Sequence, residues 1–218
     1  MTELRQSLQK ANDSATGLDQ VHYQLLTHLP NSALSVLLKV YNHVWESGCF
    51  PPSWSEAVVI PIPKPGKDHL DPGNFRPIAL TSCLCKTMER MINAHLMWSL
   101  ESQSLLSEKQ CGFRKNHSML DHLVCFETFI KNAFVKEEHI LTIFFDLEKA
   151  YDTTWKHGIL ADLWDLGFRS QVFQSFLPEH FFKVRVGSNL SELHEQEMGV
   201  PQGSILSPAL LSIKIKNC

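Results

Sequence analysis

The sequence predicts an α+β fold that is mostly helical and carries a small sheet. Apolar residues recur at helical spacing in three long segments, residues 33–46, 82–99 and 119–135. Three shorter segments have the composition of strands: residues 57–63, 140–145 and 182–187. Because helices are interspersed with strands that must return to one sheet, the order of elements indicates an α+β fold.

Composition is that of a globular protein. The chain has 218 residues, of which 44% are hydrophobic and 20% charged, enough to bury a core in one domain or two small lobes. The net charge of −3 gives no overall attraction to nucleic acid. Residues 61–115 nevertheless carry eight Lys or Arg against five Asp or Glu, an excess of three positive charges. This excess indicates either a local nucleic-acid-binding patch or an ordinary solvated face.

No targeting or membrane segment is visible. The six cysteines lack paired zinc spacing and have the apolar neighbours of small buried residues in a reducing compartment. The N-terminus is polar, and no apolar run reaches membrane-spanning length. We therefore expect an intracellular, soluble protein that does not contact a membrane.

Residues 1–17 are polar and predict a flexible N-terminus, followed by one domain over residues 18–218. The first helix is expected near residues 33–46 and ends at Ser47-Gly48. Residues 57–63 predict a strand that is edge-like at its end because of its prolines. A turn with Lys64 and Lys67 follows, and Arg76 lies on the returning strand. A hairpin of this kind suits a polyphosphate, although an ordinary exposed basic hairpin has the same pattern.

Two further helices have apolar stripes. In residues 82–99 the apolar stripe leaves Lys86, Glu89 and Arg90 on the solvent-facing side of the helix. In residues 119–135 the apolar side chains are expected to face inward, namely Leu120, Leu123, Phe126, Ile130 and Phe134. Later segments predict helices over 156–166 and 170–177, and a hairpin that pairs residues 182–187 with 193–198.

The central prediction concerns residues 140–155. The apolar run there reads as a strand covered on both faces, with Asp146 at its carboxyl end and Tyr151 and Asp152 shortly after. From this segment alone, Asp146 could equally cap the next turn. Residues 199–208, GVPQGSILSP, predict a turn with an unusual backbone and then a helix that begins at Ser207-Pro208.

Together these segments resemble the motifs of reverse transcriptases, in particular those of non-LTR (LINE-type, jockey-like) retrotransposons. The resemblance covers residues 18–208. Its motifs are an Asp-x-x-x-Ala-(Phe/Tyr)-Asp strand end, the Gly-Val-Pro-Gln-Gly-Ser-x-Leu-Ser-Pro turn, the Ile-Pro-Lys-Pro-Gly-Lys and Phe-Arg-Pro-Ile hairpin, and a Gln-x-Gly-Phe-Arg segment. It implies the fingers and part of the palm of a right-hand polymerase, with an incomplete antiparallel sheet.

The resemblance also implies site residues. Asp146 would be the catalytic and metal-binding acid, with the carbonyl of Leu147 as a further metal ligand. Arg76 with Lys64 or Lys67 would hold the triphosphate of the incoming nucleotide. Tyr151 would lie under its sugar and favour deoxynucleotides. Gln202 and Gly203 would contact the nucleotide, and the template would be bound by Pro201 and Arg114.

The implied function is that of an RNA-directed DNA polymerase, acting on an RNA template, a DNA primer and deoxynucleoside triphosphates. Mg²⁺ or Mn²⁺ is expected only for a complete active site, because the paired-aspartate box of the family does not occur before Cys218. The sequence therefore predicts a domain fragment that is inactive by itself. The alternative is a non-catalytic nucleic-acid-binding remnant of a mobile element.

Overall fold

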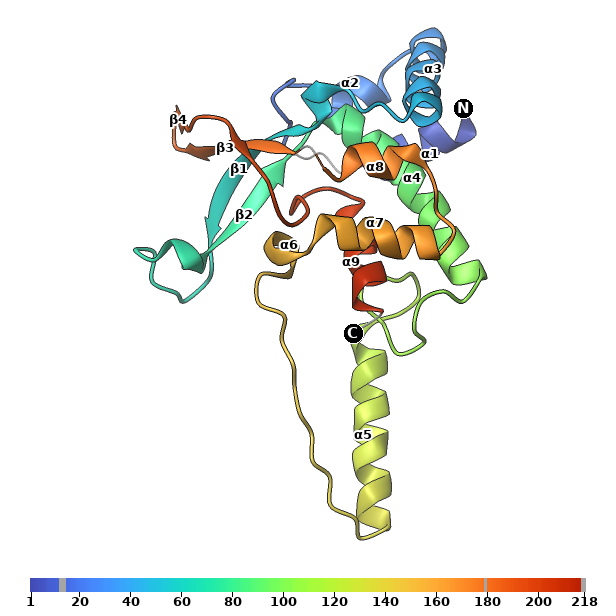
Figure 1. The fold of residues 1–218 in the computed structure, drawn as a ribbon, viewed down its shortest axis with the longest axis vertical. Coiled ribbons are helices and arrows are strands. Elements are labelled where there is room, and N and C mark those ends of the chain that lie inside the picture. The colour runs from blue at the N-terminus through green and yellow to red at the C-terminus, as the bar shows by residue number, and fades with distance from the viewer. Residues whose placement is uncertain (12–14, 179, 217–218) are drawn as a thin grey trace.

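A computed structural model describes residues 1–11, 15–178 and 180–216 (Figure 1). The helices are α1 (Thr2–Gln9), α2 (Tyr23–Thr27), α3 (Asn31–Ser47), α4 (Cys83–Ser102), α5 (Met119–Val135), α6 (Ala150–Thr153), α7 (Lys156–Asp165), α8 (Gln171–Phe176) and α9 (Ser207–Ile215), with 3-10 turns at Pro52–Trp54 and Pro72–Asn74. The strands are β1 (Glu56–Pro63), β2 (Phe75–Leu80), β3 (Phe181–Val186), β4 (Asn189–Leu190) and β5 (His194–Glu195). The predicted α+β class is confirmed.

The sheet is mixed and has the order β2-β1-β3-β4, with β5 also paired to β3. β1 runs antiparallel to β2, with Val58 opposite Leu80 and Pro63 opposite Phe75. β1 runs parallel to β3, because the chain returns through helices α4 to α8 before it forms that strand. The predicted antiparallel sheet is thus corrected to a mixed one, while the strands expected at residues 57–63 and 182–187 are confirmed.

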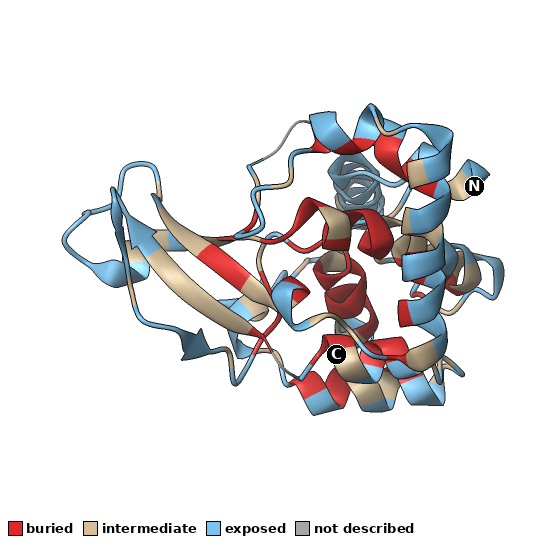
Figure 2. Cartoon of the chain, turned by 90° about the horizontal axis from the view of Figure 1, so that it is seen from above, coloured by how far each residue is buried: buried red, intermediate tan, exposed pale blue. Residues whose placement is uncertain are grey.

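The main hydrophobic core lies among the helices, and the sheet adds the buried Ala57, Val58 and Ala79 (Figure 2). Leu100, Ile159, Phe176 and Leu210 bring α4, α7, α8 and α9 together and are almost fully buried. Each such side chain contributes roughly 1.5–3 kcal/mol through its removal from water. The sheet projects to one side of this helical body, so its outer end is mostly solvent-exposed.

The N-terminus is more ordered than its composition predicts. Residues 2–9 form α1, whose Leu4 and Leu8 are buried against the core, and Arg90 of α4 donates a hydrogen bond to the carbonyl of Ser7. Leu4 and Leu8 are one helical turn apart and form a two-residue apolar stripe. The prediction of a flexible segment is therefore wrong for residues 2–9, because a stripe this short is hidden by the polar residues around it. Part of that segment, residues 12–14, lies outside the described residues.

Two expectations about the middle of the chain are also wrong. Helix α5 forms as predicted but stands away from the helical body (Figure 1), and most of its supposedly inward side chains are exposed. Residues 140–146 form no strand; they run as an extended segment beside α5, and Phe145 is 91% exposed. An extended segment becomes a strand only when another strand supplies backbone hydrogen bonds, and no strand of the described residues pairs with this one.

No helix within the described residues combines the length and the apolar character that crossing a bilayer requires.

Candidate functional site

The turn at residues 199–204 is fixed between α6 and β2. The amides of Gly199 and Val200 donate to the carbonyls of Thr154 and Tyr151, at 2.8 and 2.7 Å. On the other side, the carbonyl of Gln202 accepts a 2.8 Å hydrogen bond from the amide of Ala79. The turn leads into α9, which starts at Ser207 with Pro208 in its first turn, as the sequence predicts.

Two glycines of this turn cannot be replaced without moving backbone. Gly199 has a φ of +79°, and a Cβ there would lie 2.2 Å from the carbonyl oxygen of Tyr151. Gly203 has a φ of +143°, and its Cβ would lie 2.2 Å from the carbonyl oxygen of Ala79. Both positions need glycine for conformation and for close approach to neighbouring backbone.

A buried carboxylate holds the end of the turn. Glu89 of α4 is 1% exposed, and its Oε2 accepts hydrogen bonds from the Ser204 hydroxyl at 2.5 Å and from the amides of Ile205 and Leu206 at 2.6 and 3.2 Å. An acid there satisfies amides before the first turn of α9. The thiol of Cys85 donates to Oε1 of Glu89; burial, followed by the charge of Glu89, raises the pKa of that thiol and keeps it protonated.

The prediction that Lys86 and Glu89 lie on the solvent-exposed face of α4 is therefore wrong. Both are buried, although Arg90 is only partly so. A signal was present in the sequence, because Glu89 is four residues after Cys85 and three before Ile92, and thus shares their buried face. Its partners, 115 to 117 residues further along the chain, could not be read from that spacing.

Beside the turn lies a half-open cavity of about 250 Å³. Pro201 and Gln202 line it on one side and Pro77 and Ala79 of β2 on another, and Asp152 of α6 contributes from a third. Tyr151, the residue expected beneath the sugar, does not line this cavity; its ring packs in part against the helical core, and burial raises the pKa of its hydroxyl. The structure thus brings the predicted Pro201 and Gln202 to one concave surface with Asp152.

The basic hairpin is present, but its cations differ in their surroundings. The Lys64 ammonium donates to the carbonyl of Gly73 at 2.9 Å and is engaged within the turn. Lys67 and Arg76 are exposed and form no side-chain hydrogen bond or ion pair within the described residues. Because strand residues alternate between faces, Arg76 lies on the opposite face of β2 from Pro77 and Ala79. The hairpin tip stands off from the helical body (Figure 1).

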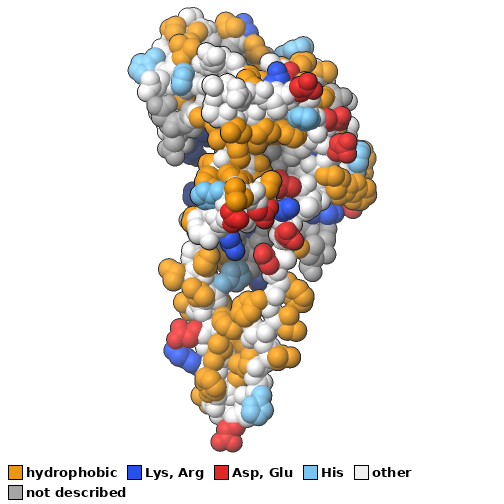
Figure 3. Space-filling model, turned by 90° about the vertical axis from the view of Figure 1, so that its left-hand side faces the viewer, with side chains coloured by type: hydrophobic (Ala, Val, Ile, Leu, Met, Phe, Trp, Pro, Cys, Tyr) orange, Lys and Arg blue, Asp and Glu red, His pale blue; other side chains and the backbone are white. Residues whose placement is uncertain are grey.

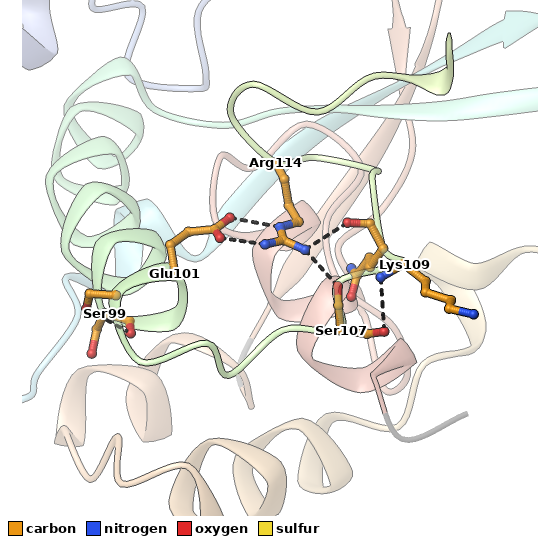
Figure 4. A network of polar contacts seen from close by, with 7 residues as sticks. Ser99, Glu101, Ser107, Lys109 and Arg114 are labelled. Atoms are coloured by element: carbon orange, nitrogen blue, oxygen red, sulfur yellow. Dashed lines mark hydrogen bonds and ion pairs between the residues drawn. The ribbon is translucent and has the colours of Figure 1, made fainter. Parts of the chain in front are cut away.

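Arg114 has a partner within the protein instead of a free guanidinium (Figure 4). Its Nε and Nη2 donate to the two oxygens of Glu101 at 2.9 and 2.6 Å, and its Nη1 donates to the carbonyls of Ser107 and Gln110 at 2.7 and 3.0 Å. The Arg114 side chain is only 9% exposed. In this structure Arg114 fixes the loop between α4 and α5, and its contact with template phosphates stays a prediction.

Asp146 and Leu147 lie on the exposed extended segment before α6. The described residues contain a single group of three or more His, Cys, Asp or Glu side chains close enough to share a metal ion, and Asp146 is not in it. Two-metal chemistry needs several carboxylates around the ions. The described residues around Asp146 do not fit that requirement.

Comparison with known proteins gives the family. The profile of the family described as reverse transcriptase (RNA-dependent DNA polymerase) matches residues 62–218. The chain is 34% identical over 200 residues to the probable RNA-directed DNA polymerase from transposon BS of Drosophila melanogaster. It is likewise 34% identical over 202 residues to the RNA-directed DNA polymerase from mobile element jockey of the same organism.

These alignments cover 90% and 91% of this chain but only 22% of each relative. A more distant relative is the Pol polyprotein from a type-1 retrotransposable element of Popillia japonica, 27% identical over 217 residues, which are 96% of this chain and 29% of that protein. The profile match spans more than half of the chain, and the resemblance seen in the sequence motifs is thereby confirmed. The chain belongs to the reverse transcriptase family and carries a reverse transcriptase domain of the kind found in non-LTR retrotransposons such as jockey.

Proposed function

We propose that this chain supplies the nucleotide- and template-facing surface of a retrotransposon RNA-directed DNA polymerase. The observation that carries the proposal is the turn at residues 199–204, fixed by backbone hydrogen bonds to β2 and α6 beside a cavity that Pro201 and Gln202 line. The Gln202 amide can donate and accept hydrogen bonds to a base edge, and Gly203, next to it, would contact the nucleotide while it lets the turn approach the backbone of Ala79. The domain over residues 18–218 would thus contain fingers and the first part of the palm.

The phosphates of the nucleotide or template would be bound by Lys67 and Arg76. They are the two cations of the hairpin that have no partner within the described residues. Lysine offers a point charge and arginine a planar fork, and both are suited to phosphate oxygens. Tyr151 would discriminate against a ribose 2′-hydroxyl, which makes deoxynucleotides the expected substrates. The RNA template and DNA primer are the expected partners.

Enzymes of this family use divalent metal ions. For an ion held by Asp146 and the carbonyl of Leu147, Mg²⁺ is the expected species, because it prefers oxygen ligands, and Mn²⁺ could replace it. Further carboxylates would have to be brought to Asp146.

Binding of a fluorescently labelled primed RNA template, followed by anisotropy over a salt series, tests the proposal. We expect the double variant Lys67→Ala, Arg76→Ala to bind roughly tenfold more weakly and to lower the slope of log K against log salt by about 2, one for each lost phosphate contact. The control Lys10→Ala, Lys39→Ala removes two exposed charges elsewhere, one directly after α1 and one on α3. Equal weakening by both double variants would refute a specific role for the hairpin.

A second candidate function is supported by the position of Asp146. Within the described residues Asp146 belongs to no group of three or more metal-ligating side chains, and such a chain can bind nucleic acid without extending a primer. We expect no incorporation of deoxynucleotides with Mg²⁺ and a primed RNA template, whereas template binding persists. Incorporation above that of an Asp146→Ala control would exclude this non-catalytic role.

A further inference from the structure

The loop between α4 and α5 brings three metal-ligating side chains together. The Cys111 thiol, the His117 imidazole and the Asp121 carboxylate each offer one ligand atom, and these atoms lie within 4.8 Å of one another. Cys111 is half-buried, whereas His117 and Asp121 are exposed. No other such group occurs in the described residues, and this one shares no residue with the turn at 199–204 or with Asp146.

We propose that Cys111, His117 and Asp121 bind one Zn²⁺ ion. A thiolate and an imidazole are ligands that Zn²⁺ accepts readily and that Mg²⁺ and Ca²⁺ disfavour. Zinc bonds of about 2.0–2.3 Å place tetrahedral ligand atoms roughly 3.5 Å apart, so small side-chain rotations would close the present separations. Three protein ligands leave the fourth position to a water molecule or to a residue elsewhere in a larger assembly.

The backbone around Cys111 is held in place before any metal binds. Arg114 donates to the carbonyls of Ser107 and Gln110, which precede Cys111, and to the carboxylate of Glu101 on α4 (Figure 4). The amide of His117 in turn donates to the carbonyl of Arg114 at 3.4 Å. Restricting the loop in this way reduces the conformational entropy that metal binding would otherwise remove.

The carboxylate of Asp121 is also oriented. Its Oδ2 accepts hydrogen bonds from the amide and hydroxyl of Ser118, at 2.6 and 3.3 Å, within the capping box of α5. An ionised carboxylate has lone pairs for a metal and for the cap at once, and hydrogen bonds to metal-ligating carboxylates are a normal feature of such sites.

Zinc would bind Cys111 through its thiolate, the form of cysteine that acts as a metal ligand. A bound ion would link the loop to the first turn of α5 and thereby set the direction of that exposed helix.

Titration of the metal-free full chain with Co²⁺, a spectroscopic substitute for Zn²⁺, tests this site. We expect one ion per chain, a near-ultraviolet band from thiolate-to-cobalt charge transfer, and loss of the band when Zn²⁺ is added. Cys111→Ser should abolish the band, and His117→Gln or Asp121→Asn should weaken Co²⁺ binding at least tenfold.

Matched controls come from α5, directly after the loop. Cys125 and His122 of α5 are exposed, so Cys125→Ser and His122→Gln change the same residue types a few positions away and should leave the titration unchanged. A second readout is hydrogen exchange, in which Zn²⁺ should slow exchange at residues 111–121 of the wild-type chain and not of Cys111→Ser. Absence of the band in the wild type, its persistence in Cys111→Ser, or its loss in Cys125→Ser would overturn the proposal.

Discussion

Replacement of Glu89 is the sharpest test of how the turn at residues 199–204 is stabilised. In Glu89→Ala, the hydroxyl of Ser204 and the amide of Ile205 lose their acceptor in a place where Glu89 itself is 1% exposed, and the amide of Leu206 keeps only the Ser204 hydroxyl oxygen, at 3.1 Å. A buried donor left without a partner costs about 1–3 kcal/mol. Two such donors, together with the weakened contact of the Leu206 amide, give an expected loss of roughly 4 kcal/mol, which is large for a single substitution.

The near-isosteric Glu89→Gln separates charge from shape. Its amide oxygen can still accept from the same three donors, but hydrogen bonds to a neutral acceptor are worth about 1 kcal/mol, compared with about 1.5–3 for a charged one. We expect an intermediate loss of roughly 2 kcal/mol. With a urea m-value near 2 kcal/mol/M, these losses correspond to midpoint shifts of about 2 M for Glu89→Ala and about 1 M for Glu89→Gln.

Urea unfolding followed by tryptophan fluorescence measures both shifts, since Trp54 is buried and reports loss of the core. The control is Glu46→Ala at an exposed position of α3, which should change the free energy of unfolding by less than about 0.5 kcal/mol. Faster hydrogen exchange at Ile205 and Leu206 should accompany the loss. If Glu89→Ala unfolds within 1 kcal/mol of the wild type, the assignment of Glu89 as the anchor of this turn is refuted.

Three further predictions concern single contacts. In Gly203→Ala the new Cβ would lie 2.2 Å from the carbonyl of Ala79, so the free energy of unfolding in urea should fall by more than about 2 kcal/mol. The control Gly66→Ala also has a positive φ but no atom within 4 Å, and it should cost only about 1 kcal/mol. Arg114→Lys keeps the charge but loses the two-pronged contact with Glu101, and we expect a loss of about 1–2 kcal/mol by the same assay; no change would show that the pair is dispensable. The hydrogen bond from Arg114 lowers the pKa of Glu101 below its usual 4.5. The stability that this pair contributes is therefore complete above about pH 4.5 and is lost as the pH falls further. If the melting temperatures of the wild type and of Arg114→Lys decline equally between about pH 5 and 3, this reasoning is contradicted.

Locally encoded features could be predicted from the sequence. The helix over residues 33–46, the strand over residues 57–63 and the turn that leads into Ser207-Pro208 depend on apolar spacing, proline and glycine, and all are present. The roles of charged residues could not be predicted in the same way. The sequence predicts a solvent-exposed position for Glu89 and a template contact for Arg114. In the structure each side chain is hydrogen-bonded to a partner that only the folded chain brings near.

The contrast between the turn at residues 199–204 and Asp146 has a physical basis. The turn obtains its hydrogen bonds from β2 and α6, which the described residues contain, so its geometry is complete without a substrate. Residues 140–146 have the apolar composition of a buried strand but no neighbouring strand in the part of the chain that the structure describes. Figure 3 shows hydrophobic side chains gathered over the part of the surface that they share with α5. Exposed apolar surface on this scale is uncommon in a stable monomer, and a strand paired along this segment would bury Phe144 and Phe145 while fixing the direction of Asp146. Asp146, the carboxylate predicted to bind metal, is thus the part of the site that depends most on a further strand pairing with residues 140–146. That strand would have to supply both the backbone hydrogen bonds and the further carboxylates that a divalent ion requires.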